Sequence, residues 1–467
     1  MARTSTYVII AIAVVIAIIA GVVIYNATYR PSPTTTLPTA SPTASSPQIS
    51  QGPTTQTPTT TACQVPDKIT IGLSISLSGS YALAGQQGLW GMLAAIKWVN
   101  DVYGGVHICG KTVKLDLKYY DDQSSKDLVP SLYERLITVD KVNFLFGPYG
   151  SPLTMAAAPV AEKYGMLLVS WMANSNKLVQ QGFRFFVMVP ALASTLWHTA
   201  LEMVHHLDPN ATVAIIYKQD EFNTVVAQGA KAKAEQLGLR VVYFKSYPVD
   251  ITDFTPIFTE VKQIGPDVIL ICSHERDGML AMQQLYQLRV NAKLIGIAVA
   301  ASLPQFYANF GRLAEGIIDG THWTPYVKWS PAVASSMGLE WFGPTEEEFM
   351  QLFKSVAGPD QQPSYHAAAG FAAVLTLVKA IETAQSLDQW AVREAYNKLS
   401  LLTIYGSFKI DPATGAQIGH KILVGQWQNG TFQIVWPPQA ASSKPVYPIP
   451  TWDEKLAGKL ATPPPGS

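Results

Sequence analysis

The sequence predicts an α/β protein of two lobes, each built around its own parallel β-sheet. From residue 67 onward, short runs of branched apolar residues alternate with longer runs in which apolar residues recur every three or four positions. Such alternation is typical of βαβ units, in which helices cover both faces of a parallel sheet. The pattern starts afresh near residue 195, and 467 residues are enough for two or three units that each bury a core.

Charge and composition exclude two classes of protein. The 33 Lys and Arg residues balance the 33 Asp and Glu residues, so the net charge is zero and no basic surface for nucleic acid is expected. Apolar residues make up 48% of the chain, which is too many for a disordered protein. We therefore expect a folded protein that does not bind nucleic acid.

An apolar segment near the N-terminus is long enough to cross a membrane. Residues 8–25 are apolar except for Gly21, and no charge lies between Arg3 and Arg30. As a helix this segment would be about 27 Å long, close to the thickness of a bilayer's hydrocarbon core. It is longer than the roughly 7–15 apolar residues of a secretory signal, and no A-x-A cleavage site follows it. We predict an uncleaved membrane anchor over residues 1–30, with a cleaved or pilin-type processed signal as the alternative.

Residues 31–62 predict an extended stalk outside the cell. They contain 11 Thr, 5 Ser and 7 Pro residues and no charged residue. Such a segment cannot bury enough apolar surface to offset the entropy lost on ordering. Asn210 and Asn429 each begin an N-glycosylation pattern, which agrees with an extracellular location.

The three cysteines predict one disulfide and one core thiol. Cys63 lies just before the strand-like segment 69–73, and Cys109 just before the segment 113–119. If these segments are neighbouring parallel strands, the two cysteines lie at the same edge of the sheet and can form a Cys63–Cys109 bridge. Cys272 falls inside an apolar strand pattern and is expected to be buried and inert.

The first lobe opens with a strand at 69–75, where alternate residues are apolar, and a Ser/Gly turn follows. A helix is predicted at 86–100 because Leu89, Met92, Ile96 and Val99 share one face at helical spacing. The same patterns predict the remaining elements of this lobe: strands at 113–120, 143–146 and 166–170, and helices at 126–138 and 154–164.

The second lobe repeats this arrangement. Its predicted helices lie at 195–207, 222–237, 254–264 and 279–287, and its strands at 212–217, 241–247, 268–272 and 294–297. The chain then continues with helices at 346–357, 365–384 and 388–398 and strands at 406–410, 421–427 and 432–436. Residues 437–467 are rich in proline and show no periodic pattern.

Sequence motifs of enzymes are missing from this chain. It has no G-x-x-x-x-G-K-[ST] phosphate loop, G-x-S-x-G elbow, H-E-x-x-H or C-x-x-C motif. His205 and His206 are adjacent, so on a helix their side chains point in different directions and do not form a metal site. Asp121 and Asp122 follow a strand, where such pairs more often make turn and cap hydrogen bonds. No catalytic residue, metal or cofactor is expected.

Small polar and aromatic residues follow the predicted strands, at the edge where open α/β sheets bind ligands. In the first lobe these segments are 76–81, 147–151 and 170–175, and in the second lobe they are Phe222, 273–276 and 296–302. Several of them precede a helix, whose free N–H groups can receive a carboxylate or carbonyl oxygen. Two lobes with such edges predict a ligand-binding cleft between them.

Several of these segments also resemble a known family. They are Ile71-Gly72-Leu73 with Leu77-Ser78-Gly79, Tyr120-Asp121-Asp122, the run from Phe146 to Ser151, the run from Ala158 to Gly165, Pro363 to Ala368, and Tyr405-Gly406 with Phe408 to Asp411. In this order and spacing they are similar to the branched-chain amino-acid and amide class of solute-binding proteins of ABC transporters. The similarity extends from about residue 67 to 436.

The resemblance implies a type I periplasmic-binding fold, in which two Rossmann-like lobes are joined by three crossovers. By position these crossovers lie near Pro190, near His322 and at 405–407. The first lobe would then consist of residues 67–190 and 323–404, and the second of residues 191–322 and 405–437. Residues 438–467 would form a Pro-rich tail.

The resemblance also implies ligand contacts in the first lobe, by position at Leu83, Ala84, Tyr149, Ser151, Met172 and Asn174. Ser151 and Asn174 would hold a carboxylate or amide oxygen, and Met172 would contribute its backbone. Tyr149 would form a wall of the pocket. Leu83 and Ala84 lie in a loop where relatives often place an aromatic residue.

In the second lobe the resemblance places Phe222 over the ligand, with His274 or Glu275 reaching into the pocket. Amino-acid binders carry an acid for the ligand ammonium at the strand end around Ala298, and this chain has none there. Either Glu275 supplies that charge, or the ligand lacks an α-ammonium and is an amide, a short carboxylate or an aromatic acid.

Together these features predict an extracellular, membrane-tethered receptor that passes a small ligand to an ABC permease. We expect a monomer that is not an enzyme. A sensor of the same fold, which signals on closure instead of transporting, is the alternative.

Overall fold

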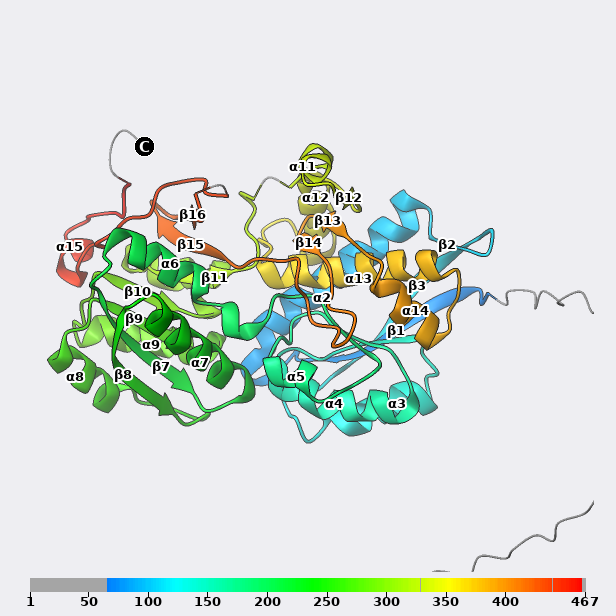
Figure 1. Cartoon of the computed structure of the whole chain (residues 1–467), viewed down its shortest axis with the longest axis horizontal. Helices are drawn as coiled ribbons and strands as arrows, with labels where there is room; N and C mark the ends of the chain where they lie inside the picture. Colours follow the sequence, from blue (N-terminus) through cyan, green and yellow to red (C-terminus); the bar gives the residue numbers. More distant parts are fainter. Residues whose placement is uncertain (1–64, 328, 439, 464–467) are drawn as a thin grey trace, which may run out of the picture. The chain divides into compact units, whose positions relative to one another are not determined.

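The computed structural model describes residues 65–463 apart from residues 328 and 439 (Figure 1). The predicted membrane anchor, the predicted stalk and Cys63 lie outside these residues, so the anchor, the stalk and the Cys63–Cys109 bridge stay predictions. Cys272 is buried and unpaired, as predicted, and burial raises the pKa of its thiol.

The first lobe contains a six-stranded sheet of order β2-β3-β1-β4-β5-β6. Its strands are β1 (Lys68–Ile75), β2 (Val106–Ile108), β3 (Lys111–Asp121), β4 (Phe144–Phe146), β5 (Leu168–Ser170) and β6 (Phe186–Met188). All neighbouring strands are parallel except the hairpin of β2 with β3. The helices that connect them are α2 (Ala82–Lys97), α3 (Val129–Thr138), α4 (Ser151–Tyr164) and α5 (Asn176–Gln180).

The second lobe contains a seven-stranded sheet of order β16-β15-β11-β10-β9-β7-β8. Five strands are parallel: β7 (Thr212–Lys218), β8 (Arg240–Tyr247), β9 (Val268–Cys272), β10 (Leu294–Ile297) and β11 (Ile318–Thr321). The antiparallel hairpin of β15 (Leu423–Gln428) and β16 (Thr431–Trp436) extends the sheet beyond β11. The helices are α6 (His198–Leu207), α7 (Glu221–Gln236), α8 (Thr255–Ile264), α9 (Glu275–Gln287) and α10 (Pro304–Phe310).

Segments from later in the chain complete the first lobe. They are α11 (Pro331–Ser336), α12 (Glu346–Ala357), α13 (Tyr365–Ala384), α14 (Gln389–Tyr396) and a small sheet of β12 (Glu340–Trp341), β13 (Leu401–Thr403) and β14 (Gly406–Phe408). Helix α13 packs directly on α2. The two backbones are so close that a Cβ atom at Gly91 would lie only 2.0 Å from the carbonyl oxygen of Ala367, so only glycine fits there. Among the described residues α13 alone is long and apolar enough to cross a membrane, but most of it is buried in this lobe.

Helix α2 begins at Ala82, four residues before the predicted start. Its first turn lacks the apolar spacing that marks the rest, because it contains small residues that approach the backbone of the preceding strand. A Cβ atom at Gly85 would lie 1.9 Å from the carbonyl oxygen of Ser76. The start of α2 is therefore set by the close approach of its backbone to Ser76, and not by the burial of apolar side chains.

The chain passes between the two lobes three times. Val189 packs in the first core and Ala191 in the second, and the second passage lies between Ile318 and Trp323. The third passage differs from the prediction at 405–407. Tyr405, Phe408 and Ile410 belong to the first core, and Ile422 is the next residue in the second. Strand β14 pairs with β13 of the first lobe, which keeps the chain there until residue 410.

The residues after β16 pack on the second lobe, although no periodic pattern marks them. Helix α15 (Trp452–Leu456) buries Trp452, whose indole N–H donates to the carbonyl oxygen of Val290 over 2.7 Å. The N–H of Ile449 donates to the carbonyl oxygen of Lys293 over 2.9 Å. These contacts are with distant residues, so periodicity along the tail does not reveal them.

Candidate functional site

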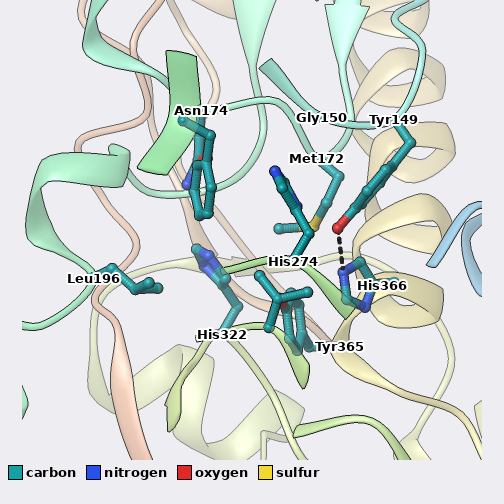
Figure 2. Close-up of a pocket in the computed structure, with 11 residues that line it drawn as sticks. Tyr149, Gly150, Met172, Asn174, Leu196, His274, His322, Tyr365 and His366 are labelled. Atoms are coloured by element: carbon teal, nitrogen blue, oxygen red, sulfur yellow. Dashed lines mark hydrogen bonds between the residues drawn. The ribbon is translucent and has the colours of Figure 1, made fainter. Parts of the chain in front are cut away.

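A cavity lies between the two lobes, where several helices begin (Figure 2). Its volume is about 20 Å³, measured as the space open to the centre of a water molecule, which is room for about one water. Its lining residues come from both lobes and from the connection at residue 322: Tyr149, Gly150, Met172, Asn174, Leu196, Phe222, His274, Val299, His322, Tyr365 and His366. A wider pocket of about 910 Å³ between the same lobes includes Tyr81, Lys218 and Asp220 in its wall.

Aromatic rings from the two lobes meet at this cavity. Tyr81 of the first lobe lies 5.5 Å from Tyr149 and 4.9 Å from His274 of the second lobe, measured between ring centres. Phe222 lies 5.3 Å from the same His274 ring. The Tyr149 hydroxyl is 3.3 Å from Nε2 of His366, and burial lowers the pKa of His366 to about 3. His366 is therefore neutral at pH 7, and the walls offer flat surfaces with hydrogen-bonding edges.

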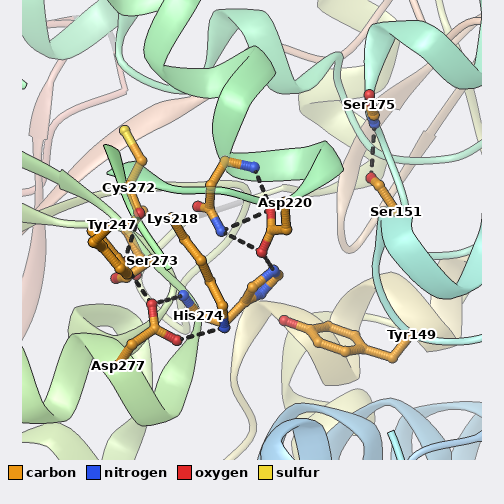
Figure 3. Close-up of polar contacts among 12 residues, drawn as sticks. Tyr149, Ser151, Ser175, Lys218, Asp220, Tyr247, Cys272, Ser273, His274 and Asp277 are labelled. Atoms are coloured by element: carbon orange, nitrogen blue, oxygen red, sulfur yellow. Dashed lines mark hydrogen bonds and ion pairs between the residues drawn. The ribbon is translucent and has the colours of Figure 1, made fainter. Parts of the chain in front are cut away.

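A buried polar network supports the second-lobe wall (Figure 3). Nζ of Lys218 lies 2.9 Å from Oδ1 of Asp277, and the Tyr247 hydroxyl donates to Oδ2 of Asp277 over 2.6 Å. Oδ2 of Asp220 lies 3.3 Å from Nε2 of His274. Burial alone would raise the pKa of Asp220, but the adjacent His274 holds it below its ordinary value. The carboxylate of Asp220 thus faces the imidazole that lines the cavity.

Glu275 is buried beside this network but does not line the cavity. Its side chain is 2% exposed, and neither carboxyl oxygen makes a hydrogen bond of ordinary geometry. Burial raises the pKa of Glu275 to about 7, opposed by His274 and by the nearby N–H groups of Glu275 and Ala84. Because Ala84 belongs to α2 of the first lobe, the Glu275 carboxyl lies where the two lobes touch.

Ser151 and Asn174 have different roles. The Ser151 hydroxyl oxygen accepts hydrogen bonds from the N–H of Asn174 over 3.2 Å and from the N–H of Ser175 over 3.0 Å (Figure 3). Ser151 is fully buried and lies outside the cavity wall. Asn174 lines the cavity, and its Nδ2 donates to the carbonyl oxygen of Ala191 over 2.6 Å. Its Oδ1 is buried without a partner.

A strained turn brings Val299 to the wall. Val299 has a φ of +65°, and the N–H of Ala300 donates to the carbonyl oxygen of Ala298 over 2.7 Å, which makes a γ-turn around Val299. A branched residue at this φ is a rare conformation. The Ser273 hydroxyl also donates to Ala298. Ala298, the predicted contact, is buried in the turn and does not line the cavity. The next residue, Val299, lines it instead.

The structure places about half of the predicted contacts on the wall. Those that line the cavity are Tyr149, Met172, Asn174, Phe222 and His274, and those that do not are Leu83, Ala84, Ser151, Glu275 and Ala298. Leu83 is 41% exposed on the surface. Tyr81, in the Ser/Gly turn just before these positions, contacts the rings of Tyr149 and His274.

Sequence reasoning missed His322, Tyr365 and His366. Tyr365 and His366 begin α13 and do not follow a strand. His322 directly follows β11 (Ile318–Thr321), a strand that the sequence patterns did not predict. The family-like segment 363–368 contained Tyr365 and His366 and could have pointed to them. The predicted glycosylation residues Asn210 and Asn429 are both exposed, and their modification stays a prediction.

The described part of the chain contains no group of three or more His, Cys, Asp or Glu residues arranged to hold a metal ion. His205 and His206 both lie in the last turn of α6.

Replacing Ser151 with alanine is expected to destabilise the protein by about 2 kcal/mol. The change leaves two buried N–H groups, of Asn174 and Ser175, without their shared acceptor, at a cost of about 1–3 kcal/mol for an unsatisfied group. Urea-induced unfolding measures the loss. Ser131→Ala is the control, because the exposed Ser131 hydroxyl only donates to the carbonyl oxygen of Leu128. Equal losses in the two variants would contradict a bracing role for Ser151.

Comparisons with known proteins identify similar chains. The periplasmic binding protein family matches residues 68–431. A curated relative, the Leu/Ile/Val-binding protein homolog 8 of Brucella abortus (strain 2308), is 23% identical over 395 residues, covering 80% of this chain and 92% of the relative.

Two solved structures show the same fold at low identity. The leucine binding protein LivK of Thermotoga maritima has a TM-score of 0.67 and 22% identity, covering 79% of this chain and 99% of that one. A solute binding protein of an ABC transporter from Rhodopseudomonas palustris BisB5, in complex with 3,4-dihydroxy benzoic acid, has a TM-score of 0.65 and 20% identity, covering 77% and 93%.

Proposed function

Because the chain belongs to the periplasmic binding protein family, we propose that it is the solute-binding receptor of an ABC importer. The observation that carries the proposal is the buried cavity whose wall is shared between two lobes. The chain connects these lobes three times, which suits a hinged closure around a small ligand. The curated relatives named Leu/Ile/Val-binding protein homologs support a role in uptake of small organic solutes.

Ligand capture would proceed by opening and closing of the lobes. The cavity has room for about one water, so a ligand with several heavy atoms requires the lobes to separate or the wall side chains to rotate. Contacts across the cleft would form on closure, including the Tyr81–His274 ring contact and the ion pair of Lys177 with Glu221 at 2.8 Å. The permease would recognise the closed form.

The receptor would be held at the outer face of the membrane by its N-terminal segment. The apolar run at 8–25 and the uncharged Thr/Ser/Pro segment at 31–62 support an anchor followed by a stalk. We propose a monomeric binding domain outside the cell, with permease subunits as its protein partners. Membrane fractionation of the full chain, compared with a variant lacking residues 1–30, tests the anchor: the full chain is expected in the membrane fraction.

The proposed function predicts ligand binding without turnover. The purified protein is incubated with amino acids, amides and short or aromatic carboxylates, and thermal unfolding is followed. A ligand at 100 times its Kd is expected to stabilise the protein by about 2.7 kcal/mol, seen as a rise in Tm. Chromatography of the same samples should recover the ligand unchanged. Consumption of a ligand would contradict the assignment as a receptor.

A further inference from the structure

Strand β11 carries a buried acid behind the cavity wall. Asp319 is 0% exposed, lies between β10 and β15 in the second-lobe sheet, and is not among the residues that line the cavity. In the described part of the chain its carboxyl has no ion-pair partner, and its Oδ1 makes no hydrogen bond of ordinary geometry. A carboxyl in such a place is costly to ionise, so its neighbours must explain why it is there.

The carboxyl of Asp319 meets the hydroxyl of Ser302, which has one hydrogen for two acceptors. Oγ of Ser302 lies 2.7 Å from Oδ2 of Asp319 and 3.1 Å from the carbonyl oxygen of Val299. If Asp319 were a carboxylate, Ser302 could donate to only one of these oxygens. If Oδ2 of Asp319 carries a proton, it donates to Ser302, and Ser302 donates to Val299. Only the neutral acid satisfies both contacts.

The surroundings of the carboxyl agree with a bound proton. Burial raises the pKa of Asp319 well above its ordinary value, opposed by Ser302 and by the N–H groups of Val299 and Gly320. Tyr365 faces this carboxyl from the first lobe, and burial raises the pKa of Tyr365 as well. These neighbours are all neutral at pH 7, so none of them holds the carboxyl in its charged form.

The last acceptor in this chain of hydrogen bonds is the strained turn at the cavity wall. Val299 has a φ of +65° and a ψ of −57°, a γ-turn conformation that a branched residue seldom adopts. Its carbonyl oxygen receives the Ser302 hydroxyl, and the carbonyl oxygen of Ala298 receives the Ser273 hydroxyl over 2.9 Å. Two hydroxyl groups thus hold the two carbonyls of the turn that places Val299 at the cavity.

The same hydroxyl is also reached from the first lobe. Ser302 lies close enough to the Tyr365 hydroxyl to oppose the rise in its pKa. Tyr365 begins α13 of the first lobe and lines the cavity (Figure 2). Because the two residues belong to different lobes, this contact requires the lobes to be together. Closure therefore adds a contact to the group that holds the Val299 turn.

We propose that Asp319, as a neutral carboxylic acid, and Ser302 are positioning residues of the ligand site. They hold Val299 on the cavity wall without touching the ligand themselves. Oδ2–H of Asp319 donates to Oγ of Ser302, Oγ–H of Ser302 donates to the carbonyl oxygen of Val299, and the proton stays on Asp319 while the ligand binds. Their role in binding rests on the proposed receptor function.

Carbon NMR of the full-length protein, labelled with ¹³C at the aspartate carboxyl carbons, tests the proton without any ligand. The Asp319 resonance is assigned by its loss in Asp319→Asn. It is expected to keep the chemical shift of a protonated carboxyl from pH 5 to pH 8. Asp116, whose pKa is lowered by the adjacent Lys68, is the control and should be ionised throughout. The shift of a carboxylate for Asp319 at pH 7 would overturn the inference.

Hydrogen exchange in the segment 298–303 tests the positioning, because the N–H of Ala300 closes the turn. Ser302→Ala and Asp319→Leu each remove a donor and are expected to speed this exchange about tenfold, the effect of one buried group left without a partner. Asp319→Asn retains a donor and should rescue slow exchange. Strand β9, separated from β11 by β10, is the internal control. Equal acceleration in β9, or no rescue by asparagine, would overturn the positioning role. If Asp319→Leu does not fold, Ser302→Ala decides.

Isoleucine and 3,4-dihydroxybenzoate, the ligands in two solved structures of similar proteins, provide the binding readout. For the probe that binds the wild type, the Kd is expected to rise about tenfold in Ser302→Ala, with rescue in Asp319→Asn relative to Asp319→Leu. Loss of the Asp319 proton when isoleucine is added would overturn the inference, because the carboxylate would then pair with the ligand ammonium. If neither probe binds the wild type, the result counts against the proposed function, and the NMR and exchange results decide the inference.

Discussion

Replacing Lys218 with methionine is expected to lower the free energy of unfolding by about 3–5 kcal/mol. The side chains of Lys218 and Asp277 are 6% and 5% exposed, and their charged atoms are 2.9 Å apart. Methionine keeps the length of the side chain but removes the charge, so Asp277 becomes a buried carboxylate without a counter-ion. Among the described residues, the Tyr247 hydroxyl and the N–H of His274 then remain as hydrogen-bond donors to Asp277.

Urea-induced unfolding of the wild type and the variant measures this loss. Lys245→Met is the matched control, because Lys245 pairs with Glu260 in the same lobe at 2.9 Å but both side chains are about half exposed. Solvent screens that pair, so a much smaller loss is expected. Removing both charges together, in Lys218→Met with Asp277→Asn, should recover part of the stability. Similar losses for Lys218→Met and Lys245→Met would show that burial does not strengthen the pair.

The alternation of strands and helices was enough to predict most strands of the two sheets, because burial on both faces makes β1, β7 and β9 continuous or alternating apolar runs. It did not predict β2, β6 or β11. The tail could not be predicted in this way. Trp452 packs against residues more than 150 positions earlier in the chain, and its own segment is too short to show a period. The third passage between the lobes also lies later in the chain than predicted. Strand β14 pairs with β13 of the first lobe, and the local sequence of β14 does not identify its partner strand.

The site shows a similar limit. Residues after strands, such as Tyr149 and Asn174, reach the cavity wall because parallel strands all end at one edge. Ser151 directly follows Gly150, which lines the cavity, but its hydroxyl accepts hydrogen bonds from two backbone N–H groups instead of facing the cavity. The residue type alone does not predict this. The Lys218–Asp277 pair joins residues 59 positions apart and has no signature in the sequence.

Glu275→Gln is expected to stabilise the protein at high pH and to leave it unchanged at low pH. In the folded protein burial raises the pKa of the Glu275 carboxyl from 4.5 to about 7. A carboxyl whose pKa is raised by folding binds its proton more tightly in the folded state than in the unfolded state. Its contribution to stability is therefore intact below pH 4.5, is lost as the pH rises toward 7, and stays lost above it.

The size of this loss follows from the two pKa values. A difference of about 2.5 units corresponds to about 3 kcal/mol at pH 8, where the wild type must bury a charged carboxylate. Glutamine has the same shape and is neutral at every pH. The free energy of unfolding of Glu275→Gln should therefore equal that of the wild type near pH 4.5 and exceed it by about 3 kcal/mol at pH 8.

The tyrosines that face Glu275 do not titrate between pH 5 and 8. His274 and Asp277 lie on the same helix start, and Tyr81, Tyr149 and Tyr365 face the carboxyl from the first lobe, with tyrosine pKa values raised by burial well above 10. Glu260→Gln is the control, since the pKa of the exposed Glu260 is lowered and it is already charged at pH 5. Its difference from the wild type should stay constant from pH 5 to 8. A Glu275→Gln difference that is equally flat over this range would mean that the carboxyl is not protonated in the folded protein. The N–H of Ala84 contacts Glu275 from the opposite lobe, so protonation of the Glu275 carboxyl should also favour closure of the lobes. Ligand affinity should therefore fall from pH 5 to 8 in the wild type but not in Glu275→Gln.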